Sequence, residues 1–205
     1  MGREVVKRPR MRLFVALDLP EQVRAALAEW GAQAVDRAGD VLRAVPPENL
    51  HLTLAFLGAR EEAPAEAIGA IVTTSAGNTC NLSLGAPLWL PPRRPGVLTV
   101  EVSDATGALA GLHASVIAAV HAGTEITPEA RPFRPHITVA RVRRGARIIP
   151  QHLQKPPSAA FNATALTLYR SIMSPKGARY EPLARRALVG SDALSLRTRP
   201  EDSAA

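Results

Sequence analysis

The sequence predicts an α+β fold built on antiparallel strands. Apolar runs of strand length and amphipathic helical segments mix along the whole chain, and some strands follow one another without a helix between them. The tetrapeptide SPKG lies between two strand-like runs and is typical of a hairpin turn. The chain has no glycine-rich phosphate loop of the usual kinds, so ATP or dinucleotide binding by those routes is not expected.

The first part of the chain predicts three strands and two helices. Pro20 follows a strand-ending Asp18 and is well placed at a helix start. Apolar residues then recur at a spacing of three or four, as in an amphipathic helix, at Val23, Leu27, Trp30 and Ala34. The elements expected here are strands at 11–17, 41–45 and 50–57 and helices at 20–38 and 64–74.

The second part predicts one more helix and five more strands. The segment PPRRPG is too rich in proline to be anything but a loop, and it separates two of these strands. Residues 145–158 also predict a loop, with room for one helical turn. The expected elements are strands at 81–90, 97–102, 136–142, 159–171 and 179–188 and a helix at 106–122.

Composition places the chain among globular proteins. Its 205 residues are 46% hydrophobic and 21% charged, and no run of 18 apolar residues is present to predict a membrane span. The first ten residues are basic but lack the apolar region of a secretory signal. Cys80 is the single cysteine, which excludes an intrachain disulfide and a CxxC zinc site and favours the cytoplasm. The net charge of +7 favours polyanionic partners.

A repeated tetrapeptide is the main functional signal. His51-Leu-Thr-Leu54 recurs as His136-Ile-Thr-Val139, and both copies open an apolar strand after a proline-containing turn. In a strand the histidine and the threonine of each copy point to one face, and the aliphatic residues point to the other. If the two copies are related by a pseudo-twofold, two imidazoles and two hydroxyls converge in one cleft.

Such a cleft suits a phosphodiester. One histidine can take a proton from water while the other gives a proton to the leaving oxygen, and the threonine hydroxyls can hold the non-bridging oxygens. A zinc site is the rival use of paired histidines. It would need a third ligand, and neither copy carries an acidic residue at a suitable place. No metal and no cofactor are therefore expected.

At these residues the sequence resembles the two-histidine (2H) phosphoesterase superfamily. Its closest match there is the LigT-like branch of RNA 2′,3′-cyclic phosphodiesterases, also called 2′-5′ RNA ligases. The similarity runs over residues 11–189 and includes MRLFVALDLP, VPPENLHLTLAFLG, FRPHITVAR and LYRSIMSPKGARYEPL in the same order. One departure is Ala55, where the branch often carries a basic residue.

The resemblance implies a fold and a reaction. It implies two pseudo-symmetric lobes, each a small antiparallel sheet with outer helices, around a central cleft. It implies hydrolysis of a terminal 2′,3′-cyclic phosphate on RNA to a 2′-phosphate, without a metal. By analogy His51 is the proton donor to the departing 3′-oxygen and His136 is the proton acceptor that activates water, while Thr53 and Thr138 hold the phosphate.

The expected organisation is a basic N-terminal extension over residues 1–10, a single bilobal domain over 11–189 and a flexible C-terminal tail over 190–205. A monomer in the cytoplasm is expected, with RNA ending in a 2′,3′-cyclic phosphate, tRNA fragments among them, as its partner. No membrane partner is expected.

Several residues outside the repeat are weighed for substrate contacts. Arg134 and Arg141 are predicted to bind phosphate, because the guanidinium geometry suits it. Phe133 and Trp89 lie in or beside loops and could stack on a terminal base. Phe56 is expected in the core by strict alternation along its strand. The remaining nearby arginines are expected to form a solvated face: Arg143, Arg144 and Arg147.

Three alternatives remain open from the sequence. Ligation of RNA ends through a 2′-5′ bond would use the same residues in the reverse direction. A cyclic phosphodiesterase acting on a small nucleotide would use them on a shorter substrate. A non-catalytic RNA-binding module is the third, and it would be favoured by the loss of a motif histidine, but His51 and His136 are both present.

Overall fold

The computed structural model describes residues 10–60, 62–75, 79–127, 132–150, 153–174 and 177–189. The larger elements in chain order are β1 (Met11–Asp18), α1 (Glu21–Ala38), β2 (Leu42–Ala44), β3 (His51–Arg60), α2 (Glu62–Thr74), β4 (Asn81–Leu90), β5 (Val97–Ser103), α3 (Ala108–Gly123), β6 (His136–Val142), β7 (Ala160–Asn162), β8 (Ala165–Ser174) and β9 (Gly177–Ala187). Short 3₁₀ turns at Gly39–Val41 and Pro47–Asn49 flank β2. The extension before Arg10 and the tail from residue 190 lie outside the described residues.

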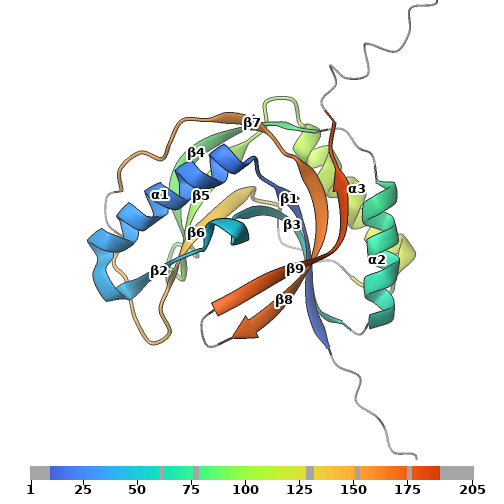
Figure 1. Ribbon diagram of the computed structural model, residues 1–205, viewed down its shortest axis with the longest axis horizontal. Coiled ribbons are helices and arrows are strands. Elements are labelled where there is room, and N and C mark those ends of the chain that lie inside the picture. Colours follow the sequence, from blue (N-terminus) through green and yellow to red (C-terminus); the bar gives the residue numbers. More distant parts are fainter. Residues whose placement is uncertain are drawn as a thin grey trace, which may run out of the picture.

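Within the described residues the strands form one sheet, with the order β7-β4-β5-β6-β3-β1-β8-β9 and with β2 beside β6. Every described pairing is antiparallel, as the sequence predicts. The sheet has two halves, because β3 and β6 pair at the single position Leu52–Ile137. The two lobes implied by the resemblance are therefore two halves of one curled sheet (Figure 1).

The sheet curls until its two sides approach each other at one end. β7 pairs with β4 and β8 pairs with β1, on opposite sides of the sheet order, yet only Ala163 and Thr164 separate them along the chain. Two residues span less than about 11 Å of chain even with the flanking bonds. The expected single strand over 159–171 is thus wrong in its continuity: it is two strands that join the two sides of the sheet.

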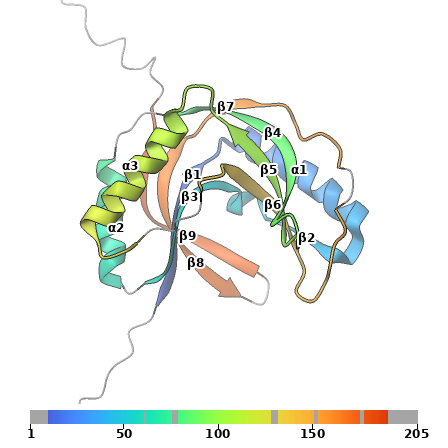
Figure 2. The same cartoon turned by 180° about the vertical axis from the view of Figure 1, so that it is seen from behind.

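The helices cover the outer, convex face of the curled sheet. α1 packs against β2 and β6, and its predicted apolar stripe is buried, with Leu27 fully enclosed. α2 and α3 lie side by side and pack against β9, β8 and β3 (Figure 2). Among the described elements, none of these three α-helices lies on the concave face of the sheet. None of the helices in the described ranges combines the length and apolar character that crossing a bilayer requires.

The two halves share a common construction. β1, α1 and β3 form one unit, and β5, α3 and β6 form the other, with the two strands of each unit paired to one another. Each helix crosses to the other half, since α1 packs on β6 and α3 packs on β3. This exchange ties the halves together and sets the two copies of the repeated tetrapeptide at equivalent places, at the starts of β3 and β6.

Candidate active site

The repeated tetrapeptides lie side by side at the centre of the sheet. Along β3, Leu52 and Leu54 are buried while His51 and Thr53 are partly exposed, and the copy on β6 follows the same alternation. Both histidines and both threonines line a cleft of about 780 Å³. The structure therefore brings together the four polar groups that the sequence singles out, on the face opposite to their aliphatic neighbours.

Hydrogen bonds fix both imidazole rings in the same way. The Nδ1–H of His51 donates to the carbonyl oxygen of Asn49 at 2.7 Å, and the Nδ1–H of His136 donates to the carbonyl oxygen of Arg134 at 2.7 Å. A carbonyl oxygen can only accept, so it holds each neutral ring in the tautomer whose Nε2 carries the lone pair. The hydroxyl of Thr53 donates to the Nε2 of His51 at 3.1 Å.

Aromatic rings enclose His51. Phe14 stacks on its imidazole with ring centroids 4.8 Å apart, and Tyr180 meets it edge-on at 5.2 Å. The pKa of His51 is lowered to about 4, mainly by burial and also by repulsion from Arg141 and His136, against the opposing effects of the Asn49 hydrogen bond and the Asp18 carboxylate. His51 is therefore neutral at pH 7 in the free chain.

A bulge in each motif strand changes which residues face the cleft. In β3 both Leu54 and Ala55 are buried, and in β6 both Val139 and Ala140 are buried, so the alternation shifts by one residue after each motif. Phe56 consequently lines the cleft and is 59% exposed, which shows that its expected place in the core is wrong. Ala55 faces inward, so a basic residue there would not reach the cleft directly.

The same shift brings Arg141 to the cleft, at the position in β6 that corresponds to Phe56 in β3. Arg12 and Arg43 also line it, and among the described residues no acidic side chain does. Arg43 and Arg141 are direct partners in the β2–β6 pair, which places two of these cations on neighbouring strands. A cleft lined by charges of one sign attracts ligands of the other sign. The cleft is thus suited to a phosphate group.

Arg12 and Arg43 were missed by sequence reasoning. Arg12 lies two residues before Phe14, so alternation along β1 could have placed both on the cleft face. Nothing local to Arg43 indicates its position, because only the pairing of β2 with β6 brings it beside Arg141.

Three sequence-predicted contacts lie outside the cleft lining. The guanidinium of Arg134 forms an ion pair with Glu101 at 3.1 Å, although its carbonyl oxygen orients His136. Phe133 stacks on His113 of α3, with ring centroids 3.9 Å apart. Trp89 packs against the hydrophobic core. Each of these side chains is held by a partner within the fold, so we leave all three out of the proposed site.

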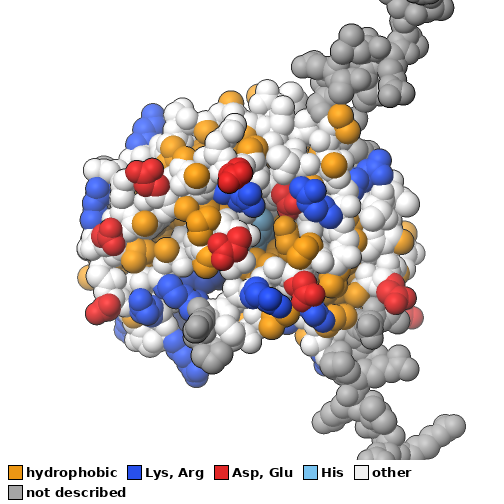
Figure 3. All heavy atoms as spheres, in the orientation of Figure 1, with side chains coloured by type: hydrophobic (Ala, Val, Ile, Leu, Met, Phe, Trp, Pro, Cys, Tyr) orange, Lys and Arg blue, Asp and Glu red, His pale blue; other side chains and the backbone are white. Residues whose placement is uncertain are grey.

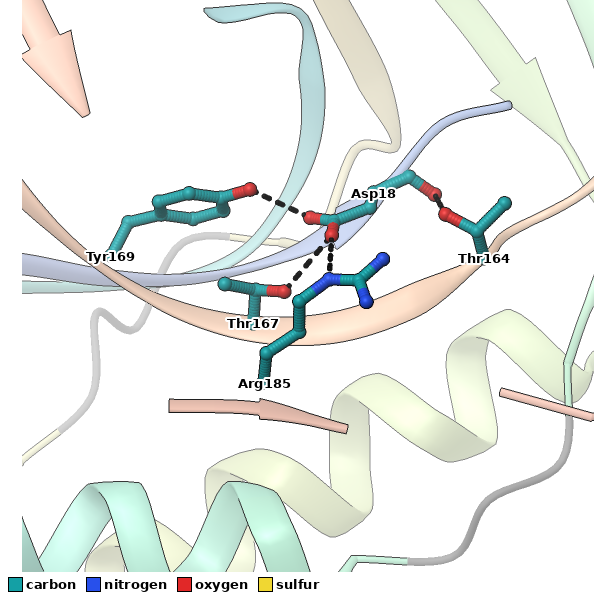
Figure 4. Close-up of polar contacts among 5 residues, drawn as sticks. All are labelled: Asp18, Thr164, Thr167, Tyr169 and Arg185. Atoms are coloured by element: carbon teal, nitrogen blue, oxygen red, sulfur yellow. Dashed lines mark hydrogen bonds and ion pairs between the residues drawn. The ribbon is translucent and has the colours of Figure 1, made fainter. Parts of the chain in front are cut away.

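An Asp18-centred network supports the wall behind His51. Asp18 pairs with His51 across β1 and β3, and its carboxylate accepts hydrogen bonds from Tyr169 at 2.8 Å and Thr167 at 3.1 Å. Arg185 donates from Nε to the same carboxylate at 2.9 Å (Figure 4). Burial and the Asp18 charge raise the pKa of Tyr169, which stays a neutral donor. Tyr169 also stacks on Phe14, so the network holds the ring on which His51 rests.

Paired histidines can also be metal ligands, but a metal site needs at least a third ligand from the protein. Over the described ranges, no group of three or more histidine, cysteine, aspartate or glutamate side chains lies close enough together to hold such an ion. His51 and His136 therefore form a pair without a third ligand among these residues.

Known proteins similar to this chain cover most of its length. A profile of the 2′-5′ RNA ligase superfamily matches residues 19–172. The chain is 34% identical to the Escherichia coli protein named RNA 2′,3′-cyclic phosphodiesterase, over 87% of this chain and 97% of that protein. It is 35% identical to the protein of the same name from Thermus thermophilus, over 88% of this chain and 91% of that protein.

The fold is also matched by a solved structure. The crystal structure of E. coli LigT in its apo form superposes with a TM-score of 0.73 and 28% sequence identity, covering 88% of this chain and 98% of that one. This match confirms the predicted α+β, LigT-like fold.

Replacing Tyr169 by Phe tests the network behind His51. The substitution keeps the ring on Phe14 but removes a hydrogen bond to a largely buried carboxylate, so it is expected to lower the free energy of unfolding by about 1–3 kcal/mol. Urea unfolding measures the change. Tyr180→Phe is the matched control, because the Tyr180 hydroxyl makes no hydrogen bond within the described residues. Equal effects of the two substitutions would contradict this role of Tyr169.

The pKa of His51 can be read from its ring signals by NMR. In the free protein the signals of His51 should stay constant from pH 8 down to about pH 5 and move only below it, since the pKa is lowered to about 4. Saturating inorganic phosphate should raise the pKa, because an anion at Nε2 stabilises the imidazolium. A His51→Asn variant assigns the signals. If His51 in the phosphate-free protein titrates near the ordinary histidine pKa of 6.5, the argument that burial lowers its pKa is contradicted.

Proposed function

Because this chain belongs to the 2′-5′ RNA ligase superfamily, we propose that it hydrolyses the terminal 2′,3′-cyclic phosphate of RNA to a 2′-phosphate. The observation that carries the proposal is the convergence of two His-Thr pairs in one cationic cleft. The similar E. coli and T. thermophilus proteins, named RNA 2′,3′-cyclic phosphodiesterases, supply the reaction class.

The chain's own residues account for each proton that the reaction moves. His136 accepts a proton at Nε2 from a water molecule, whose oxygen forms the new bond to phosphorus. His51 gives a proton to the 3′-oxygen as its bond to phosphorus breaks. Thr53 and Thr138 donate hydrogen bonds to the non-bridging oxygens, and Arg141 offsets their negative charge. The order of the two histidines follows the family resemblance, because the two copies bond their rings alike.

The donor role of His51 requires a proton that the free chain lacks at neutral pH. His51 lines the cleft, where a bound phosphodiester places a negative charge. That charge opposes both burial and the repulsion from Arg141, so it raises the pKa of His51. The substrate thus helps to charge the acid that later protonates its leaving group.

Phe56 gives the cleft an exposed aromatic surface beside the phosphate-binding groups. An aromatic ring can stack on any base without reading its identity. We therefore place the terminal base against Phe56, which leaves the enzyme tolerant of base sequence at the cyclic end.

Replacing either His51 or His136 by Ala should lower kcat by roughly 10²–10⁴-fold, the usual contribution of one general acid or base. The double variant should lose far less than the product of the two losses, since the pair works as a unit. Single-turnover rates on an oligoribonucleotide ending in a 2′,3′-cyclic phosphate measure this. Near-normal activity of either single variant would reject the assignment.

Product analysis in EDTA tests the reaction itself. The oligoribonucleotide with a 2′,3′-cyclic end should be hydrolysed at an unchanged rate in excess EDTA, and phosphorus NMR should show a 2′-phosphate. Loss of activity in EDTA would overturn the metal-independent mechanism. A 3′-phosphate product would overturn the assignment of the leaving oxygen. A joined 2′-5′ product from two RNA ends would instead show the ligation direction at the same site.

A further inference from the structure

Two loops meet at the end of the sheet where the cleft opens past Arg141. Residues 91–96 connect β4 to β5, and residues 143–147 follow β6. They are held together through their backbones, because the N–H of Val142 donates to the carbonyl oxygen of Gly96 at 2.9 Å. The N–H of Arg143 donates to the carbonyl oxygen of Val41 at 2.8 Å, which adds the turn that precedes β2 to the same group.

These loops carry a dense positive charge, which we name the arginine edge. All five of its arginines are exposed, and they are Arg93, Arg94, Arg143, Arg144 and Arg147. The segments 91–96 and 141–147 contain no acidic residue. Figure 3 shows Lys and Arg side chains gathered at the lower left of the molecule, over β2 and the neighbouring loops.

The arginine edge is distinguished by the density of its unpaired cations. Among the described residues, three arginines elsewhere pair with carboxylates at 2.7–3.1 Å, in the pairs Arg134–Glu101, Arg170–Glu181 and Arg185–Asp18, whereas others that stand singly, such as Arg24, do not. Within the described part of the chain, none of the five arginines of the edge forms an ion pair. The fold therefore concentrates cations there without internal compensation, which is unfavourable unless an external anion supplies it.

The arginine edge continues directly from the cleft. Arg141 lines the cleft and pairs with Val97 on one side and Arg43 on the other, and Arg143 follows two residues later. A chain of phosphates that begins between the histidines can therefore pass over Arg141 onto the two loops. The first anion of that chain is the cyclic phosphate, and each upstream nucleotide adds one more.

We propose that the arginine edge binds the upstream phosphates of a single-stranded RNA whose cyclic end occupies the cleft. This inference rests on the proposed function and adds to it the surface that holds the RNA chain upstream of its cyclic end. Arginine suits phosphate because its planar donors bind two oxygens at once. The described loop residues offer no aromatic side chain to read bases, so the contact is to the backbone and independent of sequence. The continuity of the arginine edge with the cleft favours RNA over an acidic protein, because a protein partner would not require the two surfaces to be joined.

Salt dependence tests the proposal. For single-stranded nucleic acid, each phosphate contact contributes about −0.7 to the slope of log K, the logarithm of the association constant, against log salt concentration. The probe is a ten-nucleotide RNA that ends in a 2′-phosphate and is therefore not turned over. Two to three upstream contacts should make its slope more negative than that of a nucleoside 2′-monophosphate by about 1.4 to 2.1. Fluorescence anisotropy with labelled RNA, and competition by the mononucleotide, measure both.

Single substitutions locate the contacts. Arg94→Ala, Arg144→Ala and Arg147→Ala should each make the oligomer slope shallower, by up to about 0.7, and leave mononucleotide affinity unchanged. Arg24→Ala on α1 is the matched control, since it removes the same charge away from the edge and should leave both slopes unchanged. Equal changes in Arg24→Ala and the edge variants would reduce the effect to net charge and overturn the proposal.

The remaining outcomes separate this proposal from the proposed function. Hydrolysis is measured in parallel on an oligoribonucleotide and a mononucleotide that each carry a 2′,3′-cyclic phosphate. If both are hydrolysed but the oligomer and the mononucleotide bind with equal salt slopes, the arginine edge is not an RNA site, although the proposed reaction stands. The alternative of a small-nucleotide substrate would then be favoured. Unchanged oligomer binding in the triple variant of Arg94, Arg144 and Arg147 would also overturn it, leaving an acidic protein partner or a solvated face. No hydrolysis of either cyclic substrate would instead overturn the proposed function.

Discussion

The pairing of β3 with β6 is the constraint on which the site depends. It involves one residue pair, Leu52 with Ile137, and both side chains are fully buried. α1 packs on β6 and α3 packs on β3, each in the opposite half of the sheet, so these helices hold the two strands next to each other from the convex side. The residues on either side of this pair in each strand then face the concave side. One apolar contact thus positions two imidazoles and two hydroxyls that lie far apart in sequence.

The bulges after the two motifs give this symmetrical core an asymmetric cleft. Each bulge turns the fifth residue after the motif histidine toward the substrate side, and that residue is Phe56 in one copy and Arg141 in the other. One half of the cleft therefore offers an aromatic surface and the other offers a cation. This difference between equivalent positions suits a substrate with a base on one side and a phosphate chain on the other.

The sequence predicts what depends on local periodicity. The apolar stripe of α1 and the His-x-Thr faces of two strands follow from spacing alone, and the structure places them as expected. Positions that depend on pairing or on a change of phase could not be obtained in this way. Phe56 was assigned to the core because alternation carries no sign of a bulge, and Arg43 reaches the cleft only through the pairing of β2 with β6. Arg134 lies near His136 in sequence, but Glu101 on the neighbouring strand binds its side chain.

The cations of the cleft affect both an entering phosphate and the protonation of His51. They attract a phosphate, but the charge of Arg141 also disfavours a proton on His51 and, together with burial as the larger cause, lowers its pKa to about 4. An anion that enters the cleft cancels this repulsion, so binding of the phosphate and protonation of His51 favour each other. By linkage, the bound complex takes up a proton in the pH range between the free and the bound pKa of His51. Asp18 is the neighbour of His51 across β1 and β3, and the negative charge of its carboxylate also raises the pKa of His51. The aromatic enclosure of His51 therefore keeps its imidazole neutral at pH 7 in the free chain, and a negative charge in the cleft favours the protonated form.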